Sequence, residues 1–423
     1  MSRIEINKAP EAYVVVPCYV TAALFFVLAS ILLGITGKEI LGHYFQPKVL
    51  AIVHTLALGW GSMIILGAAY QLVPVIFGKK LFSPPMAFGS YLLLMMGSLL
   101  LIYCFWHFKT DHWMIIAGSL VCLSSYLYFL NLWMTIKDVS HGFELNLFFS
   151  FSAFWFCFTT TIGLLLAINL YHGFLSKNHL DILKLHAHAG IVGWFLQLIL
   201  GAGAKMLPMF LLGKSNKTRF LYAAVVLINL GLCVFLADGY LNSVGLNSLW
   251  SASLIFLGFI SWAIYILDCI KNRARKKIDI PMKHALLSFI CSLMAFAMLP
   301  IVVQTPAGNV ISLYAFLIFM GWITGIVLGM TFKTLPFIIW NLKFKDLNGK
   351  EKIPMPKDMY SQQLLKGQFF LFIGNLLLSL LGISLKISWL LEGAPYLWTL
   401  LSILYLWNVL MVVFYKRRRS DAD

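Results

Sequence analysis

The chain contains ten histidines, whose side chains could bind a heme iron or another metal. Neutral imidazole is a common protein ligand for iron, copper and zinc. Three of them, His54, His186 and His188, lie inside strongly apolar sequence. An ionisable side chain in such a segment is expected to face the helix bundle and to find a partner there. We therefore take these three histidines as the candidate cofactor and metal ligands.

The spacing of His186 and His188 restricts what the pair can bind. On a helix these two residues diverge by about 200°, so they present one imidazole to each side and do not grip one ion together. Small residues share a face with each candidate ligand: Ala57, Gly61, Ser62 and Ala68 with His54, and Gly190, Gly193 and Gly201 with His186. Such faces suit either a planar cofactor or close helix packing. Interhelical hydrogen bonds without a cofactor therefore stay open as the alternative.

The helix that contains His54 is written three times. The copies read HTLALGWGSMIILGAAYQLVP from His54, HAGIVGWFLQLILGAGAKMLP from His188 and FLIFMGWITGIVLGMTFKTLP from Phe316, offset by 134 and 128 residues. Each contains a Gly-Trp pair at the same place, which puts Trp60, Trp194 and Trp322 in one column. These tryptophans either border a macrocycle or anchor helix packing. Together with Gly61, Trp60 and Trp194 are candidate cofactor-binding residues.

The composition places the chain in a membrane. Hydrophobic residues make up 61% of the sequence and charged residues 11%, as in integral membrane proteins. Apolar runs about long enough to cross a bilayer are centred near residues 23, 63, 96, 123, 158, 198, 230, 259, 293, 325, 375 and 405. We predict an all-α integral membrane protein with a single membrane domain over residues 1–423. Its twelve helices would form three parallel four-helix repeats, approximately 11–140, 141–275 and 276–416, with pseudo-threefold symmetry.

The basic residues indicate the orientation. A cytoplasmic amino terminus places 24 of the 32 Lys and Arg in cytoplasmic segments, as the positive-inside rule favours. We expect a multi-pass protein of a bacterial-type cytoplasmic (inner) membrane with both termini cytoplasmic. The net charge of +16 is then explained by topology and anionic lipid, and no nucleic-acid partner is implied. In this topology His54, His186 and His188 enter the membrane at one depth near its outer surface, where we expect the imidazoles of the sister helices to converge.

The repeated helix and the twelve-helix pattern resemble subunit I of the heme–copper oxidase superfamily, and within it the divergent cytochrome-cbb-like and NnrS-like members. The resemblance covers the membrane region, and its sharpest part is the string from His54 to Pro74. It implies a low-spin heme, b-type, with His54 as a ligand. It also implies that an H-x-H pair serves two hemes from opposite sides, although here the pair lies on the sixth helix and not on the tenth. Cytochrome c or other respiratory subunits are the partners that the resemblance implies, and copper is a further candidate cofactor.

Two departures from that family bear on activity. The tenth helix has Phe316 in the histidine column, and the seventh helix lacks the paired histidines that hold copper beside the oxygen-reducing heme. We therefore expect a heme protein in electron transfer or in oxygen, nitric-oxide or copper metabolism, and we leave open whether it is an oxidoreductase. The alternatives are a copper-handling protein that uses His43, His107, His112, His172 and His179, or a cofactor-free transporter.

Overall fold

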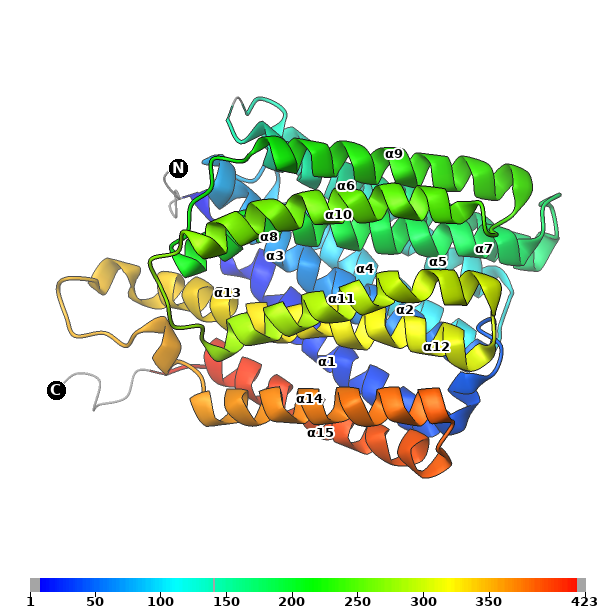
Figure 1. Ribbon diagram of the computed structural model, residues 1–423. Helices are drawn as coiled ribbons and strands as arrows, with labels where there is room; N and C mark the ends of the chain where they lie inside the picture. Colours follow the sequence, from blue (N-terminus) through cyan, green and yellow to red (C-terminus); the bar gives the residue numbers. More distant parts are fainter. Residues whose placement is uncertain (1–7, 140, 417–423) are drawn as a thin grey trace. The chain divides into compact units, whose positions relative to one another are not determined.

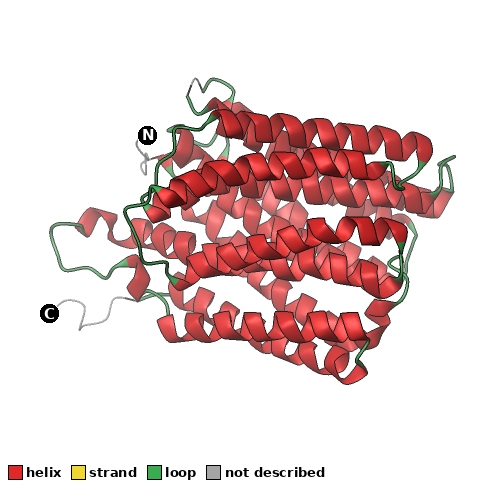
Figure 2. Ribbon diagram, in the orientation of Figure 1, coloured by secondary structure: helices red, strands yellow, loops and turns green. Residues whose placement is uncertain are grey.

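The computed structural model describes residues 8–139 and 141–416, and within them it contains helices and connections but no β-strand (Figure 2). The α-helices are α1 (Ala12–Thr36), α2 (Pro47–His54), α3 (Met63–Phe77), α4 (Pro84–Trp106), α5 (His112–Ile136), α6 (Phe143–His172), α7 (His179–His188), α8 (Gln197–Leu211), α9 (Arg219–Asn242), α10 (Ser248–Lys271), α11 (Ile280–Gln304), α12 (Gly308–Phe316), α13 (Thr324–Phe344), α14 (Gln362–Leu385) and α15 (Ser388–Val413). Short 3₁₀ turns at Gly37–Leu41, Lys345–Leu347 and Pro356–Asp358 complete the connections.

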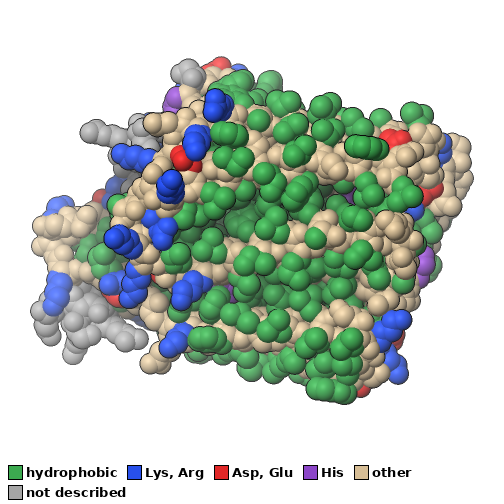
Figure 3. Space-filling model, viewed as in Figure 1, with side chains coloured by type: hydrophobic (Ala, Val, Ile, Leu, Met, Phe, Trp, Pro, Cys, Tyr) green, Lys and Arg blue, Asp and Glu red, His purple; other side chains and the backbone are tan. Residues whose placement is uncertain are grey.

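Twelve helical spans among the described residues are long and apolar enough to cross a membrane. Each of the twelve centres expected from the sequence falls inside one of them. Hydrophobic side chains cover the surface along the helices in Figure 3, while Lys and Arg gather at helix ends. The prediction of an all-α, multi-pass membrane protein is therefore confirmed.

The chain divides into two compact units, which we describe separately. Among the described residues, unit 1 contains 70–139 and 141–278 with two short segments, 8–10 and 299–305. In it α4 packs on α5, α5 on α6, and α9 on α10 (Figure 1). Unit 2 contains residues 11–69, 279–298 and 306–416, and there α1 and α14 both pack on α15. These units are defined by packing, so the repeat boundaries expected from the sequence stay a prediction.

The three copies of the repeated helix share a local distortion. In each copy the α-helix gives way to a π-helical segment directly after the histidine column: Thr55–Ser62 after His54, Ala189–Leu196 after His188, and Leu317–Ile323 after Phe316. Hydrogen bonds in a π-helix run from residue i to i+5, and such segments are rare and concentrate at functional sites. The Gly-Trp pair of every copy lies inside its π-helical segment.

Two glycines in each copy bring a neighbouring helix close to its backbone. A Cβ atom built on them would clash with or closely approach the facing helix: Gly59 with Phe25, Gly67 at 2.6 Å from Cys18, Gly193 at 2.5 Å from Trp155, Gly201 at 2.6 Å from Phe148, Gly321 at 2.9 Å from Cys291, and Gly329 with the Pro281 carbonyl and at 2.8 Å from His284. We call these three pairs of contacts, made by α1, α6 and α11, the glycine crossings. The glycines of each crossing are eight residues apart and their partners seven, so the same packing is made three times.

The same polar contact also occurs once within each unit. In unit 1 the Asn131 Oδ1 accepts from the backbone N–H of Ser83 at 3.0 Å, and its Nδ2 donates to the Ser83 carbonyl at 2.8 Å. In unit 2 Asn408 makes the same two bonds to Ser361, at 2.9 and 3.2 Å. Both serines cap the helix that follows them, α4 and α14 respectively. These polar groups are satisfied inside apolar surroundings, where an unmade bond is costly.

Candidate functional site

The candidate ligands lie at equivalent places in two different units. His54 is the last residue of α2 in unit 2, and His188 is the last residue of α7 in unit 1. Each immediately precedes a π-helical segment, and each is partly buried. His186 lies on α7 as well. Because the histidines are divided between the two units, the expected convergence of their rings stays a prediction.

The imidazoles of His54 and His188 are held in the same way. The Nδ1 atom of His54 lies 2.8 Å from the carbonyl oxygen of Leu50, and that of His188 lies 2.8 Å from the carbonyl oxygen of Lys184. A carbonyl oxygen only accepts, so in the neutral ring the proton is on Nδ1 and the lone pair is on Nε2. A backbone carbonyl on one ring nitrogen is the usual support of a histidine that binds metal through the other.

His186 has the same tautomer but a different support. Its Nδ1 donates to the carbonyl oxygen of Thr159 on α6 at 3.0 Å. The ring packs over Gly163, because a Cβ atom at that position would come within 2.9 Å of the His186 Cε1. The missing side chain of Gly163 therefore leaves the space that this imidazole occupies. Thr159 and Gly163 were not singled out from the sequence, and only their place opposite His186 on α6 identifies them.

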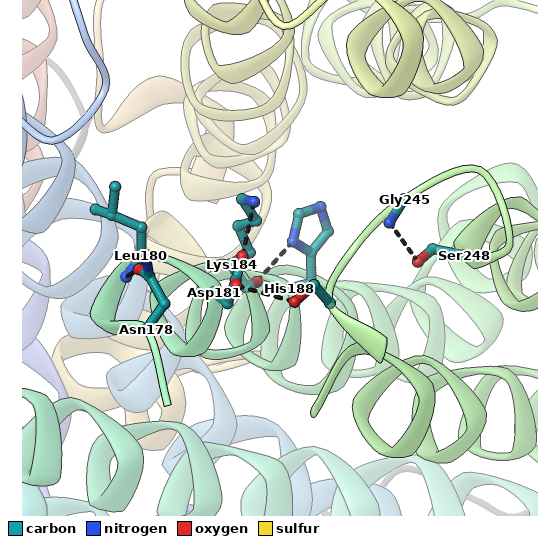
Figure 4. Close-up of polar contacts among 8 residues, drawn as sticks. Asn178, Leu180, Asp181, Lys184, His188, Gly245 and Ser248 are labelled. Atoms are coloured by element: carbon teal, nitrogen blue, oxygen red, sulfur yellow. Dashed lines mark hydrogen bonds and ion pairs between the residues drawn. The ribbon is translucent and has the colours of Figure 1, made fainter. Parts of the chain in front are cut away.

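His188 faces a different neighbour. Its ring lies 5.1 Å from the ring of Phe235 on α9, centroid to centroid, whereas His186 contacts α6. The two imidazoles thus point to different helices, as the spacing argument requires. Figure 4 shows the His188 ring with Nδ1 toward the Lys184 carbonyl, and the Lys184 side chain in an ion pair of 3.0 Å with Asp181.

The small-residue face below His186 is filled by protein. Gly193 and Gly201 face Trp155 and Phe148 in the glycine crossing of α6, and Gly190 meets the side chain of Thr159. Of the two alternatives that the sequence left open for this face, close helix packing is therefore the one observed. A planar cofactor held by His186 does not lie along these glycines, since α6 covers them.

The faces assigned to residues beyond His54 need a correction as well. A regular α-helix would place Ala57, Gly61 and Ser62 on the same face as His54. The segment Thr55–Ser62 is instead π-helical. A π turn contains more residues than an α turn, so the assumed rotation of about 100° per residue does not hold there. Gly61 is buried in this segment, and its assignment to a cofactor face stays a prediction.

The tryptophans of the repeated helix are buried between aromatic rings. Trp60 stacks on Phe26 at 4.6 Å and meets Tyr405 edge-on at 5.3 Å, and its Nε1 donates to the Thr324 hydroxyl at 3.0 Å. Trp194 stacks on Phe156 at 4.4 Å and meets Tyr128 edge-on at 5.5 Å. Both indoles are at most 1% exposed. These contacts are those of packing anchors, the second role that the sequence allowed.

The remaining outer histidines are the basis of the copper-handling alternative. Within the described part of the chain, no group of three or more His, Cys, Asp or Glu side chains is placed to hold one metal ion. His43 accepts from the Phe45 backbone N–H at 3.1 Å, and His179 bonds Asn169 at 3.1 Å. The copper-handling alternative relied on these histidines. Among the described residues, the fold does not bring three or more of them together as metal ligands.

The support of His186 can be tested through Gly163. We expect Gly163→Ala to push the His186 imidazole away from the Thr159 carbonyl. Overpacking of this kind should lower the free energy of unfolding by about 1–3 kcal/mol. Gly89→Ala is the matched control, because a Cβ atom there meets nothing within 4 Å. Thermal unfolding in detergent measures both variants. Equal midpoints for the two would contradict the packing of His186 against this glycine.

No known protein family matches this sequence, and a search of curated proteins found no match to it.

Proposed function

We propose that this chain is a heme-binding membrane protein related to subunit I of the heme–copper oxidases. It would act in electron transfer or in oxygen, nitric-oxide or copper metabolism near the outer face of the membrane. The observation that carries the proposal is the common state of His54, His186 and His188. Each donates from Nδ1 to a backbone carbonyl, which fixes the ring and puts the lone pair on Nε2, the tautomer of an imidazole that binds metal through Nε2.

The donor set fits a heme iron. Neutral imidazole is a usual axial ligand, and a hydrogen bond from its other nitrogen fixes the ring and raises its basicity. The seven cysteines form no C-x-x-C-H sequence, so the heme would be held without thioether bonds, as in b-type proteins. A bound heme supplies one-electron redox chemistry and binds diatomic gases.

The residues of the chain would contribute orientation and exclusion of water. The carbonyls of Leu50, Lys184 and Thr159 hold the three imidazoles. Phe235 contributes an apolar surface beside His188. In such surroundings the reduction potential of a heme rises or falls with burial and with the hydrogen bonds to its ligands.

We also propose the three parallel four-helix repeats with pseudo-threefold symmetry. The three glycine crossings, the three π-helical segments and the duplicated Asn–Ser contact support this arrangement. The stacking partners of the tryptophans agree with it too, because Phe26 and Phe156 occupy the same place on α1 and α6.

A four-electron oxygen reductase is not the function we propose. The span α12–α13 has Phe316 in the histidine column, and α9 contains no histidine. Copper beside the heme would lack its usual imidazoles. Cytochrome c or another respiratory subunit is the partner class that the proposal entails for electron delivery.

The proposal is tested by an optical spectrum combined with elemental analysis of the protein purified from heme-replete cells. We expect a Soret band and, after reduction, an alpha band, with iron bound. A colourless protein without metal would end the proposal, and copper without heme would favour the copper-handling alternative.

The proposed topology places both termini in the cytoplasm of a bacterial-type inner membrane. We expect green fluorescent protein fused to the carboxyl terminus to fluoresce, and alkaline phosphatase fused after Leu246, in the connection between α9 and α10, to be active. Each reporter works on one side of the membrane only. An active phosphatase at the carboxyl terminus, with no activity after Leu246, would reverse the orientation.

A further inference from the structure

One histidine outside the candidate site is the most deeply buried of all those described. His284 on α11 is 0% exposed, and within the described residues neither of its ring nitrogens has a hydrogen-bond partner. Its ring lies 4.8 Å from that of Phe369 and 5.3 Å from that of Phe372, both on α14. An ionisable side chain inside a membrane span marks a functional site by default.

Two amides on α14 share this condition. Gln368 and Asn375 are each 1% exposed, and the side-chain oxygen and nitrogen of both lack a partner among the described residues. They are seven residues apart, so they lie on one face of the helix. Phe372, which contacts His284, lies on that face between them. We call His284, Gln368 and Asn375 the α11–α14 polar seam.

The seam is costly if it is dry. A buried polar group without a partner destabilises the folded state, and three such side chains together do so severalfold. In hydrocarbon there is no bulk water to relieve them. Unsatisfied polar groups of this kind in native proteins are normally met by an enclosed ligand or an ordered water.

The sister crossings show that the fold itself does not require a polar residue here. The place that His284 takes against Gly329 is taken by Cys18 against Gly67 and by Phe148 against Gly201. A thiol and a phenyl ring therefore complete the same packing in the other two copies. The histidine is a property of the third copy alone, and this copy is also the one with Phe316 in place of the column histidine.

We propose that the α11–α14 polar seam is a binding site for a small uncharged molecule that both donates and accepts hydrogen bonds, and that its resident ligand is ordered water. One imidazole and two amides offer donors and acceptors but no net charge. Asp279, the residue before α11, forms an ion pair with Lys333, so an ion in the seam would be poorly compensated and its desolvation costly. A water takes up roughly 30 Å³ in the liquid and offers both donors and acceptors to such groups.

The test is water-edited solid-state NMR of the full-length protein in lipid bilayers, with ¹⁵N-labelled histidine and tryptophan. The His284 signals are those lost in His284→Phe, a change that reproduces the residue of the second crossing. Trp398 is the dry reference, because its indole is 0% exposed and bonds the Ser379 hydroxyl at 3.0 Å. We expect water magnetisation to reach the His284 ring severalfold faster than Trp398. Transfer as slow as to Trp398 would overturn the proposal.

A second variant separates hydration from packing. In Gln368→Leu/Asn375→Leu the histidine remains, and we expect transfer to its ring to slow to the rate of Trp398. If His284→Phe does not fold, His284→Cys, which reproduces the first crossing, provides the assignment. Unchanged transfer in the double variant would overturn the role of the amides. One equivalent of bound metal that is lost with His284 would show a metal site and overturn the proposal of water.

Discussion

Replacing His188 by alanine is expected to remove or shift the Soret and alpha bands of the purified protein, and His54→Ala is expected to do the same. Each change deletes an Nε2 donor whose ring is fixed by a carbonyl 2.8 Å from Nδ1. Removing a residue that only supports a ligand typically lowers metal affinity by about 10–100-fold, and removing the ligand itself exceeds that. Heme per protein and the absorbance spectrum measure the effect.

The controls are histidines at the ends of spans. His107 follows the last residue of α4 and His172 ends α6, and neither occupies the histidine column. We expect His107→Ala and His172→Ala to keep the heme content and spectrum of the parent. Spectra that are unchanged in both His54→Ala and His188→Ala, with full heme content, would remove these residues from the site.

The second large effect is on stability. We expect Trp194→Ala and Trp60→Ala to lower the free energy of unfolding by about 3–5 kcal/mol each, the range for deleting a large buried aromatic side chain. Both indoles are stacked on a phenyl ring, and at most 1% of each side chain is exposed. Thermal or denaturant unfolding in one detergent provides the comparison.

Trp250 is the matched control for this series, since its side chain is 80% exposed. We expect Trp250→Ala to change stability by less than about 0.5 kcal/mol, as exposed substitutions usually do. If Trp194→Ala were as stable as Trp250→Ala while heme binding was lost, the tryptophan would serve the cofactor and not the packing. Such a result would reverse the role that we assign to it.

The spans and the ligand tautomers differ in how far the sequence could predict them. Long apolar runs separated by polar connections determine where a chain crosses a bilayer, so the twelve spans were predictable from hydropathy alone. The equivalent positions of His54 and His188 in two sister helices were also visible in the repeated string. The carbonyl partners of their Nδ1 atoms were not, because rotamer and helix register decide them.

Local helix geometry defeated part of the site prediction. The spacing of apolar residues does not predict the π-helical segment Thr55–Ser62. The face for Gly61 was therefore worked out with the rotation per residue of an α-helix, which does not apply there. The glycines below His186 were ambiguous for another reason: small residues admit a cofactor and a neighbouring helix equally well. Only the side chains of α6, such as Trp155 at Gly193, decide between them.

The buried polar seam was missed because single residues in apolar runs look alike in sequence. His284, Gln368 and Asn375 belong to two spans that are far apart along the chain, and only packing brings α11 to Phe372. An alignment of the three glycine crossings identifies His284 as unusual, because the equivalent residues are Cys18 and Phe148. It becomes visible once the facing residues of the glycines are known.

The most direct test of the central claim is electron–nuclear double resonance on the purified, oxidised protein grown with ¹⁵N-histidine. We expect a low-spin heme whose iron is coupled to imidazole ¹⁵N, with the coupling lost or altered in His188→Ala and His54→Ala. A heme signal without ¹⁵N-histidine coupling, or a protein with no heme at all, would contradict it.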